Sequence, residues 1–300
     1  MNESISRRRL RSRFGLLLIA GALLSGCAHR LEPEGAPRKE TAFAVTASHT
    51  LVSFNAGRPT TLLSRKRLVG LPGGETLIGI DFRVARGQLF ALSDRGRLYR
   101  IDTATAALTP VGGGIGTELR GARFGFDFNP TVDRIRVVSD AGQNLRLHPD
   151  TGVAIDAEPQ TPGVQPDGAL AYAPGDVNAG RGARIVAAAY TYNKDNEKIT
   201  TNYALDAQSA SLVIQGSREG MSPAVSPNTG RLSTVGPLGA GGFEQASFDI
   251  SDLTNTGFAA LTRAGARDSQ WYVIDLASGK ATALGAIGTG ETVVGIAIEP

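Results

Sequence analysis

Cysteine and histidine are scarce in this 300-residue chain, and that limits the chemistry it can carry. Cys27 is the single cysteine, so an intramolecular disulfide is impossible. The histidines, His29, His49 and His148, have no metal-ligand spacing with one another or with Cys27, which argues against zinc. No Gly-x-Ser-x-Gly nucleophile elbow occurs, and the glycine-rich run at 112–116 lacks the Lys-Ser/Thr of a phosphate loop. No motif therefore names a reaction.

The long apolar run of the chain lies at its N-terminus, at residues 14–24, directly after a cluster of arginines. It is too short to span a bilayer and has the length of a signal-peptide core. The following Leu-Ser-Gly-Cys resembles a bacterial lipobox, which implies cleavage before Cys27 and lipidation of its thiol. An ordinary signal peptide that contains a cysteine is the alternative. Ala28 stands where a retention aspartate would favour the inner membrane, so we expect a lipid anchor in the outer membrane, on the periplasmic side.

The chain has no excess of positive charge once residues 1–27 are removed. The full chain has 31 basic and 28 acidic residues, and residues 1–27 hold five Arg and one Glu, which leaves 26 basic and 27 acidic residues. A net charge of −1 indicates no polyanion-binding surface, so nucleic acid is not an expected partner. Residues 28–41 are rich in Pro, Glu and Lys, which predicts a flexible tether.

Long amphipathic helical periods are absent from residues 42–300, where short apolar runs alternate with turn residues. This alternation is typical of many short strands. The segments 79–112 and 125–155 share one pattern, namely Gly-apolar-Asp-Phe, a turn, a second strand ending in Ser-Asp, a tight turn and a third strand. A late copy covers 247–288. A looser copy begins at 168, and we align its first strand at 169–172.

The two ends of the domain are incomplete in complementary ways. Residues 295–300 supply only the first strand of a repeat, and residues 42–70 read as its second, third and fourth strands. A unit shared between the termini is the ring closure of a β-propeller. The sequence therefore predicts an all-β propeller over 42–300, with five blades, or six because the third copy is long. A β-sandwich is the main alternative, but it leaves the incomplete ends unexplained.

Three of the five first strands carry an aspartate at the same position. In register, that third position is Asp81, Asp127, Ala171, Asp249 and Ala297. First strands line the channel of a propeller, so three carboxylates at one level need partners. One hypothesis is a site for Ca²⁺ or another divalent cation, and nearby arginines (Arg83 and Arg123) are other possible partners. We favour a structural role instead, in which each carboxylate accepts main-chain N–H bonds that join two blades.

The repeat segments, above all FGFDFNPTVDRIRVVSDAGQNLRL at 124–147, resemble the bacterial domain of unknown function 4394. The resemblance covers about residues 42–300. It implies an exported, propeller-like repeat protein and supplies no activity, cofactor or catalytic residue.

These observations favour a membrane-tethered binding or scaffolding module with a protein or small-molecule ligand on its loop faces. The alternative is a metal-dependent hydrolase of the propeller lactonase type, with the three aspartates as ligands. Fold alone does not decide between the two functions.

Overall fold

The structure is a computed structural model that describes Met1 and residues 35–300. The predicted signal peptide, Cys27 and residues 28–34 of the predicted tether lie outside the described residues. The described part contains twenty strands and two single-turn 3₁₀ helices, η1 (Val84–Arg86) and η2 (Pro227–Thr229). In this part of the chain, no helix has the length and apolarity needed to cross a membrane.

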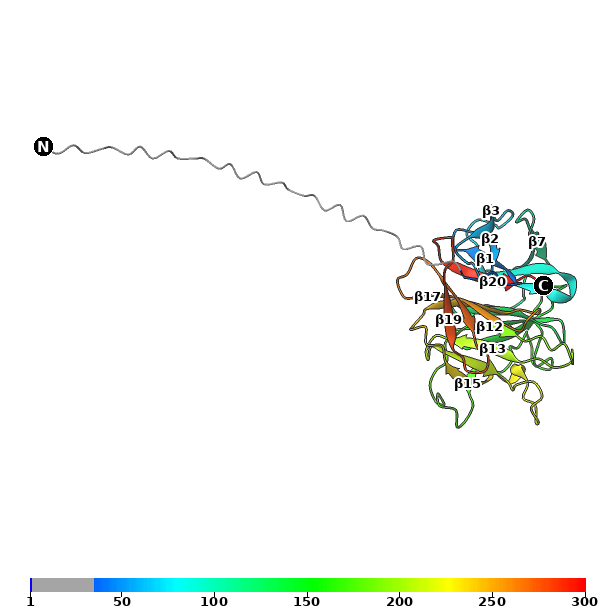
Figure 1. Ribbon diagram of the computed structural model, residues 1–300. Coiled ribbons are helices and arrows are strands. Elements are labelled where there is room, and N and C mark those ends of the chain that lie inside the picture. Colours follow the sequence, from blue (N-terminus) through cyan, green and yellow to red (C-terminus); the bar gives the residue numbers. More distant parts are fainter. Residues whose placement is uncertain (2–34) are drawn as a thin grey trace. The chain divides into compact units, whose positions relative to one another are not determined.

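Five sheets form the blades of a β-propeller, which confirms the predicted fold and blade number (Figure 1). Blade 1 comprises β4 (Leu77–Arg83), β5 (Gln88–Ser93), β6 (Leu98–Ile101) and β7 (Leu108–Val111). Blade 2 comprises β8 (Phe124–Asn129), β9 (Arg134–Ser139) and β10 (Asn144–Leu147). Blade 3 comprises β12 (Ile185–Tyr190), β13 (Asn202–Asp206), β14 (Ser211–Gln215), β15 (Arg231–Pro237) and β11 (Ala171–Tyr172). Blade 4 comprises β16 (Gln245–Ile250), β17 (Gly257–Thr262), β18 (Gln270–Ile274) and β19 (Ala281–Ala286).

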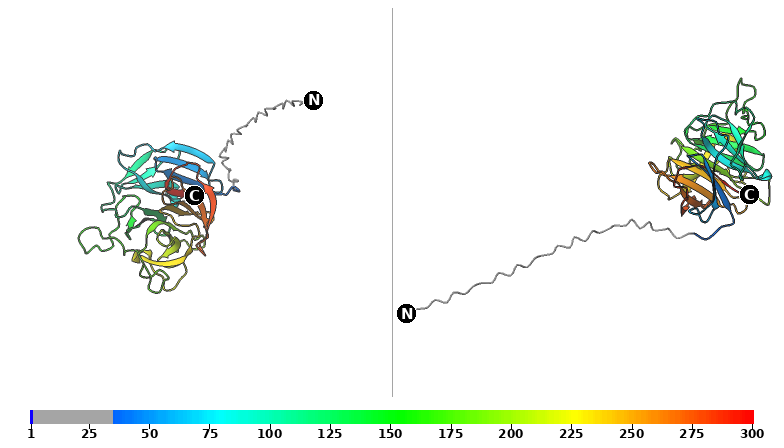
Figure 2. Two further views of the ribbon diagram at one scale, coloured as in Figure 1. Left: turned by 90° about the vertical axis from the view of Figure 1, so that its left-hand side faces the viewer. Right: turned by 90° about the horizontal axis from the view of Figure 1, so that it is seen from above.

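The fifth blade is built from both ends of the domain. It contains β20 (Val293–Ile298), β1 (Thr41–Thr46), β2 (Thr50–Asn55) and β3 (Leu62–Arg67) in that order. The last strand pairs antiparallel with the first, and Ile298 lies opposite Ala42. Figure 2 shows the red C-terminal strand beside the blue N-terminal strands. The predicted ring closure is confirmed.

The inner strand of blade 3 differs from the predicted one. Our alignment placed it at 169–172, but Ala171 and Tyr172 form β11, a short strand paired in parallel with the outer strand β15. The inner strand is β12, which lies between the inner strands β8 and β16. Ala189 therefore replaces Ala171 at the third position. The error arose because β12 reads IVAAAY and lacks the Gly-apolar-Asp-Phe pattern, which residues 168–172, including β11, resemble more closely.

Small residues on the inner strands allow neighbouring blades to approach closely. A Cβ added to Gly79 would lie 2.5 Å from Cβ of Phe126, and one added to Gly125 would lie 2.6 Å from the main-chain nitrogen of Ala188. Phe126 is itself buried in the apolar core between blades 1 and 2. The small face of one inner strand thus packs closely against the next inner strand.

Residues just before β1 already contact the propeller. The main-chain nitrogen of Arg38 donates to the side chain of Asn55 at 2.9 Å, and the Asn55 amide donates back to the Arg38 carbonyl at 2.8 Å. The buried Glu40 accepts a hydrogen bond from Thr254 in blade 4 at 2.5 Å. The packed domain therefore starts a few residues before β1.

Candidate functional site

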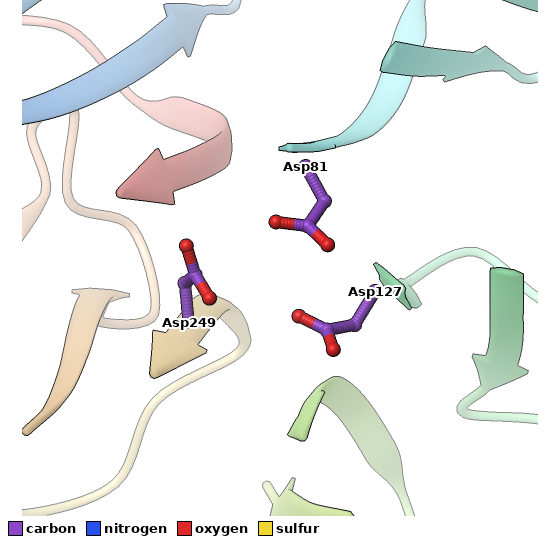
Figure 3. A group of neighbouring side chains, drawn as sticks. All are labelled: Asp81, Asp127 and Asp249. Carbon is purple, nitrogen blue, oxygen red and sulfur yellow. The ribbon is translucent and has the colours of Figure 1, made fainter. Parts of the chain in front are cut away.

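The structure brings the three predicted aspartates together at the centre of the ring. Asp81 on β4, Asp127 on β8 and Asp249 on β16 are at most 5 % exposed. Each offers a carboxylate oxygen that lies within 4.8 Å of the oxygens offered by the other two. Figure 3 shows the three carboxyl groups facing one another from three separate strands.

Each aspartate also joins its own blade to the next one in the ring. The donor is the main-chain N–H of the residue that follows the third position on the next inner strand. The pairs are Phe128 N to Asp81 Oδ2 at 2.7 Å, Tyr190 N to Asp127 Oδ2 at 2.9 Å, and Ile298 N to Asp249 Oδ2 at 2.5 Å. These bonds match the structural role that we favoured for the aspartates.

The remaining oxygens complete a ring of main-chain bonds. Asp81 and Asp249 also accept the N–H of the following residue in their own strands, Phe82 at 2.7 Å and Ile250 at 2.6 Å. Their blades, 1 and 4, follow blades 5 and 3 in the ring, which carry alanine at the third position. The preceding blade therefore offers no carboxylate to the N–H groups of Phe82 and Ile250. Five equivalent N–H groups are thus satisfied by five of the six carboxylate oxygens. The other oxygen of Asp127 accepts no main-chain N–H from any residue that the structure describes, and a side-chain hydrogen bond joins Asp127 to Asp81.

Burial and mutual repulsion favour protonation of this cluster. Burial raises the pKa of Asp81 well above its usual value, and the charge of Asp249 raises it further. Burial also raises the pKa of Asp127 well above the usual range, followed by the charges of Asp81 and Asp249. Burial raises the pKa of Asp249 to about 7. The cluster therefore holds at least one proton near neutral pH, and a protonated Asp127 can donate its O–H to Asp81.

The two arginines near the aspartates in sequence have other roles in the structure. Arg83 is buried and forms ion pairs with Asp133 and Asp150 at the rim of blade 2. Arg123 donates to the carbonyl of Ala122 at 3.0 Å. Neither contacts a channel aspartate, so the main-chain N–H groups and the shared proton are the partners that the described residues supply.

A hollow of about 340 Å³ opens where the inner strands end. Arg83, Asn129, Tyr192 and Asp252 line it, each at the end of an inner strand or within two residues of it. Burial raises the pKa of Tyr192 well above its usual value, and the charges of the channel aspartates and Asp252 raise it further. This hollow, the channel mouth, therefore lies close to the three carboxylates.

A larger hollow of about 740 Å³ lies between blades 2 and 3, and our sequence reasoning missed it. We call it the blade 2–3 cleft. Its charged lining residues are Arg134, Arg136, Arg146, Lys198, Arg218 and Glu219. A signal for it was present in the repeat alignment, because Arg136 occupies the place that Phe90 holds in blade 1.

A family model described as "Domain of unknown function (DUF4394)" matches residues 50–297. The chain belongs to this family. The resemblance that FGFDFNP and its neighbouring strands suggested is therefore confirmed, and the match spans nearly the whole DUF4394 propeller. No curated protein matches the sequence.

Several solved structures are similar to this DUF4394 protein at low identity. Hydrazine synthase of Kuenenia stuttgartiensis is 14 % identical with a TM-score of 0.40, over 73 % of this chain and 51 % of that one, so this chain spans about half its length. Glutaminyl cyclase of Myxococcus xanthus is 13 % identical with a TM-score of 0.39, over 71 % and 76 %. A protein of unknown function from Bacteroides thetaiotaomicron is 13 % identical with a TM-score of 0.43, over 83 % and 58 %.

Proposed function

We propose that this DUF4394 protein is a binding module whose ligand site is the face on which the inner strands end. One observation carries the proposal. The channel mouth and the blade 2–3 cleft share the lining residues Asn129, Thr131 and Ile199, so the two hollows adjoin on this face. Their volumes, about 340 and 740 Å³, lie within the range of small-molecule sites.

The test is a screen for ligands that stabilise the fold. The full chain, purified in detergent, is melted with a library of neutral, cationic and anionic small molecules, and bound proteins are sought by pull-down from solubilised envelopes. We expect at least one compound or protein to bind, because a ligand that binds only the folded state raises the melting temperature. Ala224→Trp, which fills the cleft rim, should weaken the effect.

Ala264→Trp is the matched control, since Ala264 is exposed in blade 4 and lines none of the described hollows. The proposal is wrong if no compound shifts the melting temperature and no protein is enriched. It is also wrong if Ala264→Trp weakens binding as much as Ala224→Trp.

We further propose that the module is tethered to the cell envelope through lipidated Cys27. The lipobox-like sequence and the preceding apolar run support this proposal. Cells expressing the protein are labelled with an alkyne analogue of palmitate, and label is expected on the wild type but not on Cys27→Ser. Equal labelling of both proteins would reject the anchor at Cys27.

A second candidate is the metal-dependent hydrolase, and the convergence of Asp81, Asp127 and Asp249 within 4.8 Å is the observation in its favour. Against it, five of the six carboxylate oxygens already accept main-chain N–H bonds, whereas Ca²⁺ takes six to eight oxygen ligands. We expect neither calcium nor a chelator to move the melting temperature. A calcium-dependent rise that Asp127→Asn abolishes would establish the metal site instead.

A further inference from the structure

We propose that the blade 2–3 cleft binds a small organic anion through its phosphate or carboxylate groups. This inference rests on the proposed binding function and names the chemical class of its ligand. It is carried by the cleft's uncompensated positive charge and by a buried arginine that stands where other blades carry an aromatic side chain.

The charge of the cleft contrasts with that of the rest of the domain. Residues 35–300 contain 25 basic and 25 acidic residues, so the described propeller is neutral overall. Five cationic side chains nevertheless line this one hollow, together with a single carboxylate, Glu219. Glu219 accepts hydrogen bonds from Thr191 at 3.1 Å and Asn193 at 3.4 Å and forms no ion pair with a cleft arginine.

Three of the five cations have no acidic partner. Within the described residues, Arg134, Lys198 and Arg218 form no salt bridge. Arg134 donates only to main-chain carbonyls, at 2.8 Å for Asp133. Arg218 donates to the Tyr203 hydroxyl at 2.7 Å, and its guanidinium lies 5.6 Å from the centre of the same ring. Like charges gathered without counter-charge repel one another, and an anionic ligand removes that repulsion.

The other two arginines share a single buried carboxylate. Asp167 accepts from Arg136 at 2.7 Å and from Arg146 at 2.8 and 2.7 Å, which leaves a surplus positive charge. Arg136 also donates to Tyr190, Asn144 and Asn228 at 3.1, 2.8 and 2.6 Å. These bonds fix its guanidinium at the base of the cleft, so little ordering remains to be done when a ligand binds.

Arg136 stands at a position where other blades carry an aromatic side chain. Arg136 lies directly across from Asp127 in the ladder, and the residues at the equivalent position in blades 1 and 4 are Phe90 and Phe258. Both phenylalanines are at most 1 % exposed, as core residues should be. Burying an arginine in place of an aromatic ring costs desolvation. The hydrogen bonds of Arg136 to Asp167, Tyr190, Asn144 and Asn228 offset that cost, and the net positive charge that Arg136 and Arg146 leave over Asp167 adds to the charge of the cleft.

The lining also indicates the size and character of the ligand. Serine, threonine and asparagine side chains accompany the arginines, and Val132 and Met221 expose 56 % and 58 % of their surface at the rim. A volume of about 740 Å³ accommodates a molecule with an anionic head and an organic body.

The test measures anion binding to the full chain in detergent by calorimetry and thermal melting. The probes are inorganic phosphate, pyrophosphate and citrate, compared with chloride at equal ionic strength. The cleft variants are Lys198→Gln and the double variant Arg134→Gln/Arg218→Gln, all at exposed or half-buried positions where folding should persist. Arg95→Gln is the matched control, because Arg95 is exposed on a turn of blade 1 and lines none of the hollows.

We expect pyrophosphate or citrate to bind, and the double variant to bind about tenfold more weakly because charged hydrogen bonds are lost. Phosphate-type probes binding more tightly than citrate would identify a phosphorylated ligand, and the reverse a carboxylated one. Equal weakening in Arg95→Gln would show non-specific attraction and overturn the proposal. If neutral compounds bind but no anion does, the anionic class is wrong and the binding function stands. If nothing binds, both fail.

Discussion

Asp127 differs from the other channel aspartates in the number of main-chain donors it serves. Asp81 and Asp249 accept two N–H bonds each, whereas Asp127 accepts one, from Tyr190, and hydrogen-bonds to Asp81 with its side chain. We therefore assign the proton of the cluster to the second oxygen of Asp127, which accepts no main-chain N–H from the described residues. An amide can replace a protonated carboxyl group in this setting, since it offers one acceptor and one donor.

Asp127→Asn is expected to change the free energy of unfolding by no more than about 0.5 kcal/mol, a typical value for a benign substitution. Asp81→Asn is expected to cost about 1–3 kcal/mol, because one of two buried N–H groups loses its acceptor. Urea denaturation of both variants at pH 7.5 measures the difference. Equal losses in the two variants would contradict the assignment of the proton to Asp127.

The raised pKa values of the cluster also predict how stability depends on pH. The folded protein keeps protons that the unfolded chain, with aspartate pKa near 3.9, has already lost. The free energy of unfolding should therefore fall as pH rises from about 4 through the Asp249 pKa of about 7. Each proton contributes a slope of up to about 1.4 kcal/mol per pH unit.

Urea denaturation at pH 5, 6, 7 and 8 tests this dependence, with Asp127→Asn as the comparison expected to show a shallower slope. The surface aspartates Asp102 and Asp275 have lowered pKa values, from main-chain hydrogen bonds, and so act in the opposite direction. Their effect is confined to pH below about 4, where they titrate. A stability that is flat or rising between pH 5 and 8 would refute the buried-proton account.

The inner strands carry small residues because each strand is packed closely between the inner strands of the two neighbouring blades. Each presents a small residue to the neighbouring strand, and the spaces at Gly79, Gly125 and Gly295 leave no room for a Cβ. The neighbour at Gly125 is main chain, which cannot move aside without shifting a whole blade. The glycine is therefore required by packing and not by a turn.

Gly125→Ala should destabilise the protein by about 1–3 kcal/mol, the usual cost of overpacking a core. Gly113→Ala is the control, because nothing lies within 4 Å of a Cβ placed there. Thermal melting of the two variants gives the comparison. If Gly125→Ala melts with the wild type, the close approach of β8 and β12 is not as tight as described.

The stability of the propeller depends on closure of the ring of blades by β20. The last strand, β20, is the inner strand of the fifth blade, and it is held there by antiparallel pairing with β1. It also donates the Ile298 N–H to Asp249 in blade 4 at 2.5 Å. Without it, two blades would expose apolar faces and unpaired edges.

Deleting residues 293–300 is expected to abolish cooperative unfolding and to cause aggregation, because the open ring has no partner for β1. Removing only residues 299 and 300, both exposed, should leave the melting temperature within a few degrees of the wild type. Size-exclusion chromatography and thermal melting distinguish the two truncations. A monomeric, cooperatively folded product of the longer deletion would contradict the closure argument.

The repeat, a ring of five or six blades, the shared terminal blade and the three aspartates were predicted from the sequence, because each depends on a local pattern that recurs at aligned positions. The structure decided the number of blades as five. Our alignment misplaced the inner strand of blade 3, since β12 carries none of that pattern and only its position between β8 and β16 identifies it. The sequence also could not predict which five main-chain N–H groups bond to the three carboxylates, because those bonds join residues up to 63 positions apart. Only the tertiary structure could assemble the blade 2–3 cleft, whose charges come from strands and loops of two different blades.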